Sequence, residues 1–502
     1  MKYRYIYLFV LALGFFACDE DDNILPEEVI LPELTAGSAD FSNYVAVGAS
    51  FTAGFTDGGL FKASQENSFP NILSKEFAKV GGGTFTQPLM SDNTGGILVG
   101  GNVVRGYRFV FNSDIPGPQS LDAFLTSLGA SVPPITTEAG ISVGSDFNNF
   151  GIPGAKSWHL VAPGYAGLNP YYERIASDPT ATVLADAIAQ NPTFFTLSEI
   201  GGNDVLGYAT SGGDGSNLIT DSATFNDALN ALITGLTSGG AKGVVTNVPF
   251  ITDLPHFTTV PHNPIPLDAT TATFLNSAAA YGAYNSGIQG AFAFLVANTP
   301  LTQELADIEI AKRTITFEAS ANNAVVIMDE SLTDLTGINE DLVSMRQATA
   351  EDLFVLPASA FIGTEAIPGN AQTVNGVAVP LADKWVLTPE EQENIKEAID
   401  AYNAAIEAIA NTNDDIALVD LNAILSETAN TGINFDGFNL NADLVTGGAI
   451  GLDGIHLTAR GYALMANKFL EAIDAAFGSN FIASGNIVRA NDYPTNYSPT
   501  LQ

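Results

Sequence analysis

Two short segments near opposite ends of the chain hold residue types that could together perform acyl-transfer chemistry. Ser50 follows an apolar run, in the segment Gly48-Ala49-Ser50-Phe51-Thr52-Ala53-Gly54. His456 lies in Leu452-Asp453-Gly454-Ile455-His456, where Asp453 precedes the histidine by three residues. A serine hydroxyl becomes an effective nucleophile when a base removes its proton, and a carboxylate beside an imidazole fixes the tautomer that this base requires. The three residues therefore predict a Ser-His-Asp triad.

Each part of this prediction has a simpler alternative. A serine just after a strand is often only an N-cap, and a histidine before a helix is often only structural. The chain has four histidines in all, the others being His159, His256 and His262. A metal pair at His256 and His262 is conceivable, but no third ligand with suitable spacing accompanies them, so a loop lining the cleft is favoured. For His159 a packed or solvated side chain is favoured over one facing the pocket.

The elements that must position these residues alternate between short buried strands and amphipathic helices from Phe41 onward. This alternation predicts a parallel sheet covered by helices on both faces. Ser50 would then lie at the carboxyl edge of the sheet, where ligands bind in open α/β folds. The expected strands are 44–47, 147–150, 193–197, 243–248 and 416–421, and the expected helices are 225–236, 388–409 and 458–473.

The chain divides into four regions. Residues 1–17 are expected to be a signal peptide, and 18–40 an acidic tether. Residues 41–478 are expected to form one catalytic domain with two insertions, about 81–144 and 299–384. The second insertion is predicted to cap the active site. Residues 479–502 are expected to be a polar tail.

Four sequence blocks, in order, resemble those of the SGNH (GDSL-type) hydrolase family. Gly48-Ala49-Ser50-Phe51 resembles the block that supplies the nucleophile. Asn149-Phe150-Gly151-Ile152-Pro153-Gly154 resembles the second block, and Gly201-Gly202-Asn203-Asp204 the third. Asp453-Gly454-Ile455-His456 resembles the closing Asp-x-x-His block. All four in this order, each at an expected strand end, favour membership over coincidence.

The resemblance implies a fold and the roles of individual residues. The fold would be a three-layer α/β/α sandwich of the flavodoxin-like type with five parallel strands. Ser50 would be the nucleophile, and His456 with Asp453 its base. The oxyanion would be held by the backbone N–H groups of Ser50 and Gly154 and by the side-chain amide of Asn203. The chain departs from the family at Ala49, where the name motif has Asp, and in the long stretch between Asp204 and Asp453.

Composition excludes several partners. Lys and Arg total 18 and Asp and Glu total 55, which gives a net charge of −37. A surface this acidic repels phosphate backbones, so nucleic-acid binding and docking to anionic lipid through a basic patch are both disfavoured. The charge is explained most simply by solubility, and a specific cation site is the less favoured alternative. The chemistry expected of the chain implies no metal and no organic cofactor.

The N-terminus resembles the targeting segment of a bacterial lipoprotein. Lys2 and Arg4 precede an apolar run over 6–17, which is too short to span a bilayer. The run ends at the only cysteine, Cys18, and this arrangement resembles a lipobox, apart from Phe15 where Leu is usual. Acylation of Cys18 would anchor the protein to the membrane of the cell envelope, as an outer-membrane or cell-surface lipoprotein. A secreted soluble protein cut nearby is the alternative.

The expected function is hydrolysis of carboxylic esters of the lipase or esterase kind, through an acyl-enzyme on Ser50. The substrate would be a small-molecule, lipid or glycan ester. A carbohydrate O-acetylesterase of the same fold is one alternative. A surface binding lipoprotein that has lost catalysis is the other.

Overall fold

The computed structural model describes residues 31–115, 117–370 and 372–501. The expected signal peptide, Cys18 and the first part of the tether lie outside these ranges. Within them, no helix combines the length and hydropathy that a bilayer crossing requires.

A five-stranded parallel sheet forms the centre of the molecule, in the order β15-β8-β7-β1-β6. Numbered along the chain, the sheet strands run 2-1-3-4-5, the flavodoxin-like order, so the predicted fold class is confirmed. β1 and β7 are buried along their whole length, as expected for strands covered on both faces. The sheet strands are β1 (Tyr44–Gly48), β6 (Asn149–Gly151), β7 (Phe194–Ser198), β8 (Lys242–Thr246) and β15 (Ile416–Val419).

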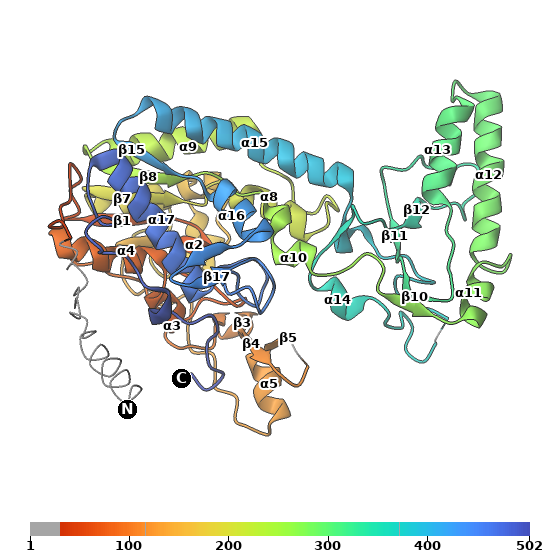
Figure 1. The fold of residues 1–502 in the computed structure, drawn as a ribbon, viewed down its shortest axis with the longest axis horizontal. Coiled ribbons are helices and arrows are strands. Elements are labelled where there is room, and N and C mark those ends of the chain that lie inside the picture. Colours follow the sequence, from red (N-terminus) through yellow and green to blue (C-terminus); the bar gives the residue numbers. More distant parts are fainter. Residues whose placement is uncertain (1–30, 116, 371, 502) are drawn as a thin grey trace, which may run out of the picture.

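Helices cover both faces of this sheet (Figure 1). α4 (Phe69–Phe77) packs against α17 (Ala459–Phe477), while α9 (Ser222–Thr237) packs against α7 (Val183–Ala189) and α15 (Pro389–Thr412). α15 begins with the predicted capping box, in which Thr388 and Glu391 exchange hydrogen bonds. Shorter helices complete the core: α2 (Ser50–Ala53), α3 (Lys62–Glu66), α6 (Pro170–Glu173), α8 (Gly202–Thr210), α10 (Pro255–Thr258) and α16 (Leu421–Asn430).

Two strands end earlier than predicted, each because a side chain takes over the backbone groups. β8 stops at Thr246 because the N–H and C=O of Val248 bond to the amide of Asn403 instead of to a neighbouring strand. β15 stops at Val419 because the Asp420 side chain accepts the N–H of Ala423 and begins α16.

The first expected insertion, 81–144, is a set of small hairpins below the sheet in Figure 1. β2 pairs with β3 and β4 pairs with β5, all antiparallel. Its elements are β2 (Ile97–Val99), β3 (Asn102–Arg105), β4 (Phe109–Asn112), β5 (Gly117–Ser120) and α5 (Leu121–Ser127).

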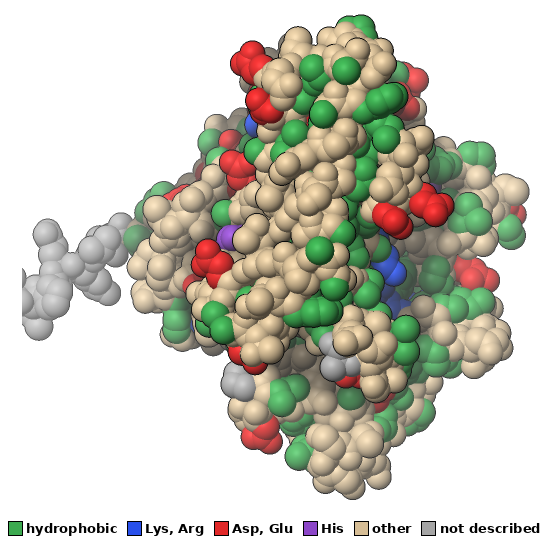
Figure 2. All heavy atoms as spheres, turned by 90° about the vertical axis from the view of Figure 1, so that its right-hand side faces the viewer, with side chains coloured by type: hydrophobic (Ala, Val, Ile, Leu, Met, Phe, Trp, Pro, Cys, Tyr) green, Lys and Arg blue, Asp and Glu red, His purple; other side chains and the backbone are tan. Residues whose placement is uncertain are grey.

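Residues 265–382 form a separate lobe at the right of Figure 1, between β8 and α15 in sequence. The lobe includes β9 and α12, so it begins earlier than the insertion predicted at 299. It consists of short antiparallel pairs and helices, and acidic side chains are spread over its outer face (Figure 2). Its elements are β9 (Ile265–Leu267), α11 (Ala269–Leu275), α12 (Tyr281–Asn298), α13 (Gln303–Arg313), β10 (Ser320–Asn323), β11 (Val326–Met328), β12 (Met345–Gln347), β13 (Leu353–Phe354) and α14 (Ala358–Phe361).

The chain returns from the lobe through η5 (Asp383–Trp385) and β14 (Val386–Leu387), which pairs with β13. After α16, the hairpin β16 (Ile433–Phe435) and β17 (Phe438–Leu440) leads into the loop that carries His456.

The segment after α17, expected to be a polar tail, packs on the core through apolar side chains. Phe481 is fully buried, and its ring lies beside the ring of Phe41. Near the end of the described chain, the carbonyl of Ser498 accepts a hydrogen bond from the buried Arg108.

Candidate active site

The turn that carries Ser50 is held at the carboxyl end of the central strand β1. Ser50 is the first residue of the short helix α2, and its side chain is nearly buried, with 7% of the residue exposed. α2 lies directly on the end of the neighbouring strand β6, where a Cβ on Gly151 would collide with the backbone of Ala53. Glycine at this position therefore allows the close approach that brings the nucleophile turn over the sheet edge.

Folding brings His456 to Ser50 and Asp453 to His456. The Nε2 atom of His456 lies 3.0 Å from Oγ of Ser50, and its Nδ1 atom lies 2.9 Å from Oδ2 of Asp453. Both distances are ordinary hydrogen bonds, in the relay arrangement that acyl transfer by serine requires. All three side chains are buried.

Asp453 is surrounded by donors. Its carboxylate accepts N–H groups from Gly58, Ile455 and His456 in addition to the imidazole. Burial alone would raise the pKa of this carboxyl, but the charge and hydrogen bonds of His456 and the backbone donors outweigh burial and hold the pKa below its usual value. Asp453 is thus suited to remain ionised and orient the imidazole.

A second buried carboxyl, Asp57, joins the nucleophile loop to the histidine loop. Its Oδ1 atom accepts the N–H of Leu452 at 2.8 Å, while the N–H of the following residue, Gly58, donates to Asp453. Burial raises the pKa of Asp57 to about 7, and the nearby charge of Asp453 adds to the rise. Two hydrogen bonds at Leu452 and Asp453 therefore join the two loops, which are far apart in sequence.

Gly154 and Asn203 follow β6 and β7, the two strands that flank β1 in the sheet. Asn203 lines the same cavity as Ser50 and His456, and its amide donates to the carbonyl of Ala155 at 2.9 Å. An amide nitrogen carries two hydrogens, so this bond leaves one of them for another acceptor. Gly154 is exposed and has a φ of +79°, next to the residue that Asn203 holds.

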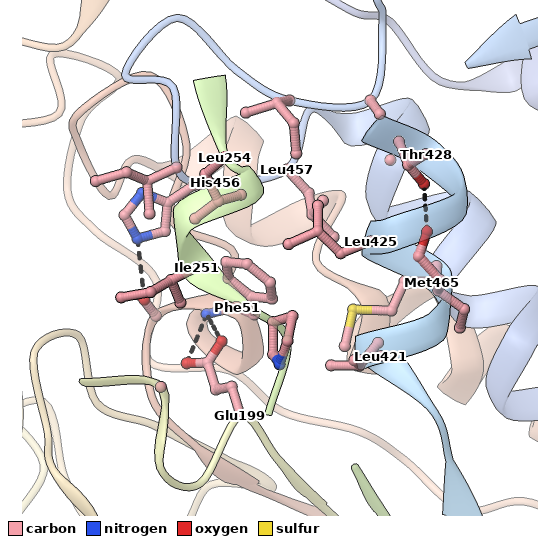
Figure 3. A pocket seen from close by; sticks show the side chains of 18 of the residues that line it. Phe51, Glu199, Ile251, Leu254, Leu421, Leu425, Thr428, His456, Leu457 and Met465 are labelled. Atoms are coloured by element: carbon pink, nitrogen blue, oxygen red, sulfur yellow. Dashed lines mark hydrogen bonds between the residues drawn. The ribbon is translucent and has the colours of Figure 1, made fainter. Parts of the chain in front are cut away.

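Glu199 supports the nucleophile turn from below. It follows β7, is buried, and accepts the N–H of Phe51 at 2.9 and 2.7 Å with its two carboxylate oxygens (Figure 3). Burial raises the pKa of Glu199 well above its usual value, and the bonds from Phe51 and Ala49 partly offset that rise. The chain lacks an acidic residue at position 49, and Glu199 brings a carboxylate to the same turn from the adjacent strand.

An apolar cavity opens beside Ser50. It has a volume of about 100 Å³ for the centres of water-sized molecules, and the empty space of the cavity together with its open mouth is about 950 Å³. Its walls come from Phe51, from the segment 249–254, from α16 and from α17 (Figure 3). Most of the lining side chains are aliphatic: Leu206, Ile251, Leu254, Leu421, Ile424, Leu425, Ile450, Ile455, Leu457, Leu464 and Met465.

The comparison with protein families decides the identity of this region. Residues 44–293 match the family described as GDSL-like Lipase/Acylhydrolase. This part of the chain belongs to the GDSL-like lipase/acylhydrolase family. It is accordingly a serine ester hydrolase of the SGNH kind. Comparisons with curated proteins and with solved structures gave no match.

The family match includes Ser50, Gly154 and Asn203 and ends well before Asp453. The contact between the GDSL-like region and the remainder of the chain is therefore what brings His456 to the serine. That contact includes the hydrogen bonds of Asp57 and Gly58, the pairing of β8 with β15 and the packing of α17 against α4.

The other histidines take structural positions. His256, in α10, is buried and contacts the carbonyl of Asp453 through Nδ1 at 3.3 Å, so it supports the histidine loop of the GDSL-like hydrolase without lining the cavity. His159 accepts the N–H of Lys156 and stacks on Tyr165, and burial lowers its pKa to about 4. Among the described residues, the groups suited to a metal ion include neither His256 nor His262.

Three features of the site were not anticipated. Glu199 has no distinctive sequence signal, because its partner is a backbone N–H in a distant turn. Asp57 also has no distinctive sequence signal, because its partner is the backbone N–H of Leu452 in a distant loop. α16 did carry a signal, since Asp420 is a good N-cap and Leu421, Ile424, Leu425 and Thr428 follow at helical spacing. Among the described residues of the insertion expected to cap the site, 299–370 and 372–384, none lines the cavity.

Proposed function

We propose that the protein hydrolyses carboxylic esters whose acyl group is a hydrocarbon chain, with Ser50 as nucleophile, His456 as general base and Asp453 as the group that orients the base. The observation that carries the proposal is the apolar cavity whose wall includes both Ser50 and His456. Such a cavity favours a substrate part that has no hydrogen-bonding groups.

In the first step Ser50 attacks the ester carbonyl while Nε2 of His456 takes the hydroxyl proton. The carbonyl oxygen becomes an oxyanion, for which the N–H groups of Ser50 and Gly154 and the free amide hydrogen of Asn203 are the proposed donors. One such donor in a dry site contributes about 3–4 kcal/mol. His456 then gives its proton to the leaving alcohol, which leaves the acyl group on Ser50.

In the second step His456 removes a proton from water, and the resulting hydroxide attacks the acyl-enzyme. The tetrahedral intermediate collapses, the proton returns to Oγ of Ser50, and the free carboxylic acid departs. The serine proton crosses the 3.0 Å contact between Oγ of Ser50 and Nε2 of His456 in the first step and returns across it at the end of the second, while the 2.9 Å bond to Asp453 orients the imidazole throughout.

The cavity also favours this proposal over a carbohydrate O-acetylesterase and over a binding protein without catalysis. A carbohydrate O-acetylesterase needs room for one methyl group, which would leave most of the aliphatic wall without a partner. A binding protein without catalysis does not require a serine hydroxyl, an imidazole and a carboxylate in one chain of hydrogen bonds. An acyl-ester hydrolase accounts for both features.

The nucleophile is tested by replacing Ser50 with Ala and measuring turnover of p-nitrophenyl esters beside fluorophosphonate labelling. We expect turnover to fall at least about a thousandfold and labelling to disappear. Ser479→Ala, at another buried serine, is the matched control and should keep both. Equal turnover in wild type and Ser50→Ala would overturn the proposal.

The acyl preference is tested with esters from acetate to dodecanoate. Each added CH₂ that the cavity buries contributes up to about 0.8 kcal/mol, so kcat/KM should rise by up to about fourfold per CH₂ until the cavity is full. Leu425→Trp on α16 should move the optimum to shorter chains and leave acetate turnover nearly unchanged. Leu305→Trp, at a position of α13 that is 53% exposed, should not move it. A preference for acetylated glycans would instead favour the deacetylase.

The proposal extends to location. Acylation of Cys18 after removal of residues 1–17 would tether the hydrolase to a bacterial membrane of the cell envelope, near lipid esters. Cys18→Ser should release the protein into the soluble fraction, and mass spectrometry of the wild type should find a diacylglyceryl cysteine. A soluble wild-type protein with no lipid would support secretion instead.

A further inference from the structure

Three carboxylates gather where the lobe meets the hydrolase core. Glu330 follows β11 in the lobe, Asp383 begins η5 on the return path, and Glu391 lies in the first turn of α15. One oxygen from each lies within 4.8 Å of the others. Because Ca²⁺ binds oxygens at about 2.3–2.6 Å, ligands of a single ion are at most about 5 Å apart, so this spacing fits one ion.

The cluster has no cationic side chain of its own. Among the residues that the structure describes, no Lys or Arg forms an ion pair with Glu330, Asp383 or Glu391. Asp329, which directly precedes Glu330, differs in this respect because it forms an ion pair with Arg346, and Arg346 also forms an ion pair with Asp352. The lobe therefore neutralises one buried acidic group with arginine and leaves its neighbour unpaired.

Glu391 provides a second, independent indication of a ligand. It is only 4% exposed, and its Oε2 atom is occupied by the N–H and hydroxyl of Thr388 in the capping box. Its Oε1 atom is buried with no hydrogen-bond partner among the described residues, and so is Oδ1 of Asp383. Buried carboxylate oxygens without partners are costly, and a bound cation removes that cost.

The backbone beside the cluster is shaped to admit these side chains. Gly212 and Gly213, directly after α8, have φ values of +64° and +74°. A Cβ on Gly212 would collide with the carbonyl of Asp383, and a Cβ on Gly213 with Oε1 of Glu391. Only glycine leaves room here, so the segment after α8, the return path and the first turn of α15 are in close contact at this point.

We propose that Glu330, Asp383 and Glu391 bind one divalent cation of the calcium type, which fastens the lobe to the hydrolase core. The ligands are oxygens only, as hard cations prefer, and backbone carbonyls and water would complete the six to eight positions around Ca²⁺. The competing explanation is a proton shared between the carboxyls, since burial and neighbouring charges raise the pKa of Asp383 to about 7 and that of Glu391 to about 8. The proposal is independent of the ester chemistry, and the sequence had predicted no metal.

The test uses terbium, which takes the same oxygen ligands as Ca²⁺ and emits when a nearby tryptophan is excited. Trp385 is two residues from Asp383, in the same turn, and the only other tryptophan is Trp158. We expect sensitised emission from the full-length protein, displaced by Ca²⁺. Trp385→Phe should abolish it, and Trp158→Phe should leave it unchanged.

Variants separate this site from unspecific binding by an acidic surface. Glu330→Gln, at an exposed position, should weaken Ca²⁺ binding about tenfold or more and remove the rise in Tm that millimolar Ca²⁺ produces. Glu340→Gln, at another exposed lobe position, should change neither. Equal responses of the two variants, or no emission from wild type, would overturn the proposal. A higher Tm of Glu330→Gln without any calcium response would identify the shared proton instead.

Discussion

The carboxylates around Ser50 and those at the lobe junction are both buried, and they differ in what surrounds them. Asp453 and Glu199 each meet backbone N–H groups, and Asp453 also meets an imidazole. At the junction, Glu391 uses one oxygen for its helix cap, and its other oxygen has no hydrogen-bond partner in the described part of the chain. Donors within the chain outweigh burial at Asp453 and only partly offset it at Glu199, whereas Glu391 has a buried oxygen for which the described chain supplies no donor.

This difference indicates that the number of hydrogen-bond donors around a buried carboxylate determines whether it stays ionised. Donors aimed at the charged form keep a carboxylate ionised and fixed in direction, as the proposed role of Asp453 requires. Without enough donors the same group retains a proton or holds a cation. The predictions below test the two groups in this sense, and the first has the largest expected effect.

Asp453→Asn removes the charge at the best-satisfied carboxylate. The imidazole of His456 would lose the partner that fixes its tautomer, and kcat should fall by about 10³–10⁴ with little change in KM. Ester turnover checks this, with the exposed Asp443→Asn as the matched control. Turnover within tenfold of wild type would mean that Asp453 does not orient the base.

Asp57→Asn tests a buried carboxyl that has a backbone donor, as Asp453 has, and a raised pKa, as Glu391 has. Its pKa is raised from 3.8 to about 7, so between pH 4 and 7 the unfolded chain ionises while the folded protein keeps the proton. Stability should fall as pH rises through this window, by up to about 1.4 kcal/mol per pH unit from this group. Denaturant unfolding should show that the free energy of unfolding falls less between pH 5 and pH 8 in the variant than in the wild type. An equal fall in both proteins would contradict the raised pKa of Asp57.

Glu199→Gln tests the support of the nucleophile turn. Glutamine keeps one acceptor for the Phe51 N–H but cannot hold it with two oxygens, so the turn should shift slightly. We expect kcat to fall about ten- to a hundredfold while the fold is retained, because small displacements of a nucleophile are costly. Since Glu199 also lines the cavity, the ratio between long- and short-chain esters should be measured. A change confined to KM would make it a substrate contact and not a positioning residue.

Glu330→Gln without calcium has the smallest expected effect. Removing one of three neighbouring charges at an exposed position should stabilise the protein by less than about 1 kcal/mol at pH 8. Denaturant unfolding in the presence of a chelator measures it. Destabilisation under these conditions would show that the junction is already satisfied within the chain.

Much of the fold was predictable because its signals are local. The five strands, the capping box of α15 and the sheet class follow from buried runs and cap residues that can be recognised without neighbours. The lobe was harder to bound, since α12 is apolar along much of its length and resembles a core helix. Packing of Phe481 was also unpredictable, because its partners lie in distant parts of the chain.

The site divides in the same way. Ser50, Asp453 and His456 stand in compact motifs, and the structure brings them within hydrogen-bonding distance. Glu199, Asp57 and the junction carboxylates act through partners that only folding brings close. The sequence around an isolated acidic residue does not indicate which hydrogen-bond donors will surround it in the folded protein.

The position of the lobe between β8 and α15 has one more consequence. The polypeptide leaves the core after the strands that carry Ser50 and Asn203, and it returns before the elements that carry His456. A protease that cuts near Ile367, which is 58% exposed, would thus yield one fragment with the nucleophile and another with the base. The two fragments would stay joined by the pairing of β8 with β15 and by α4 against α17, and the enzyme would survive as a noncovalent complex of two chains.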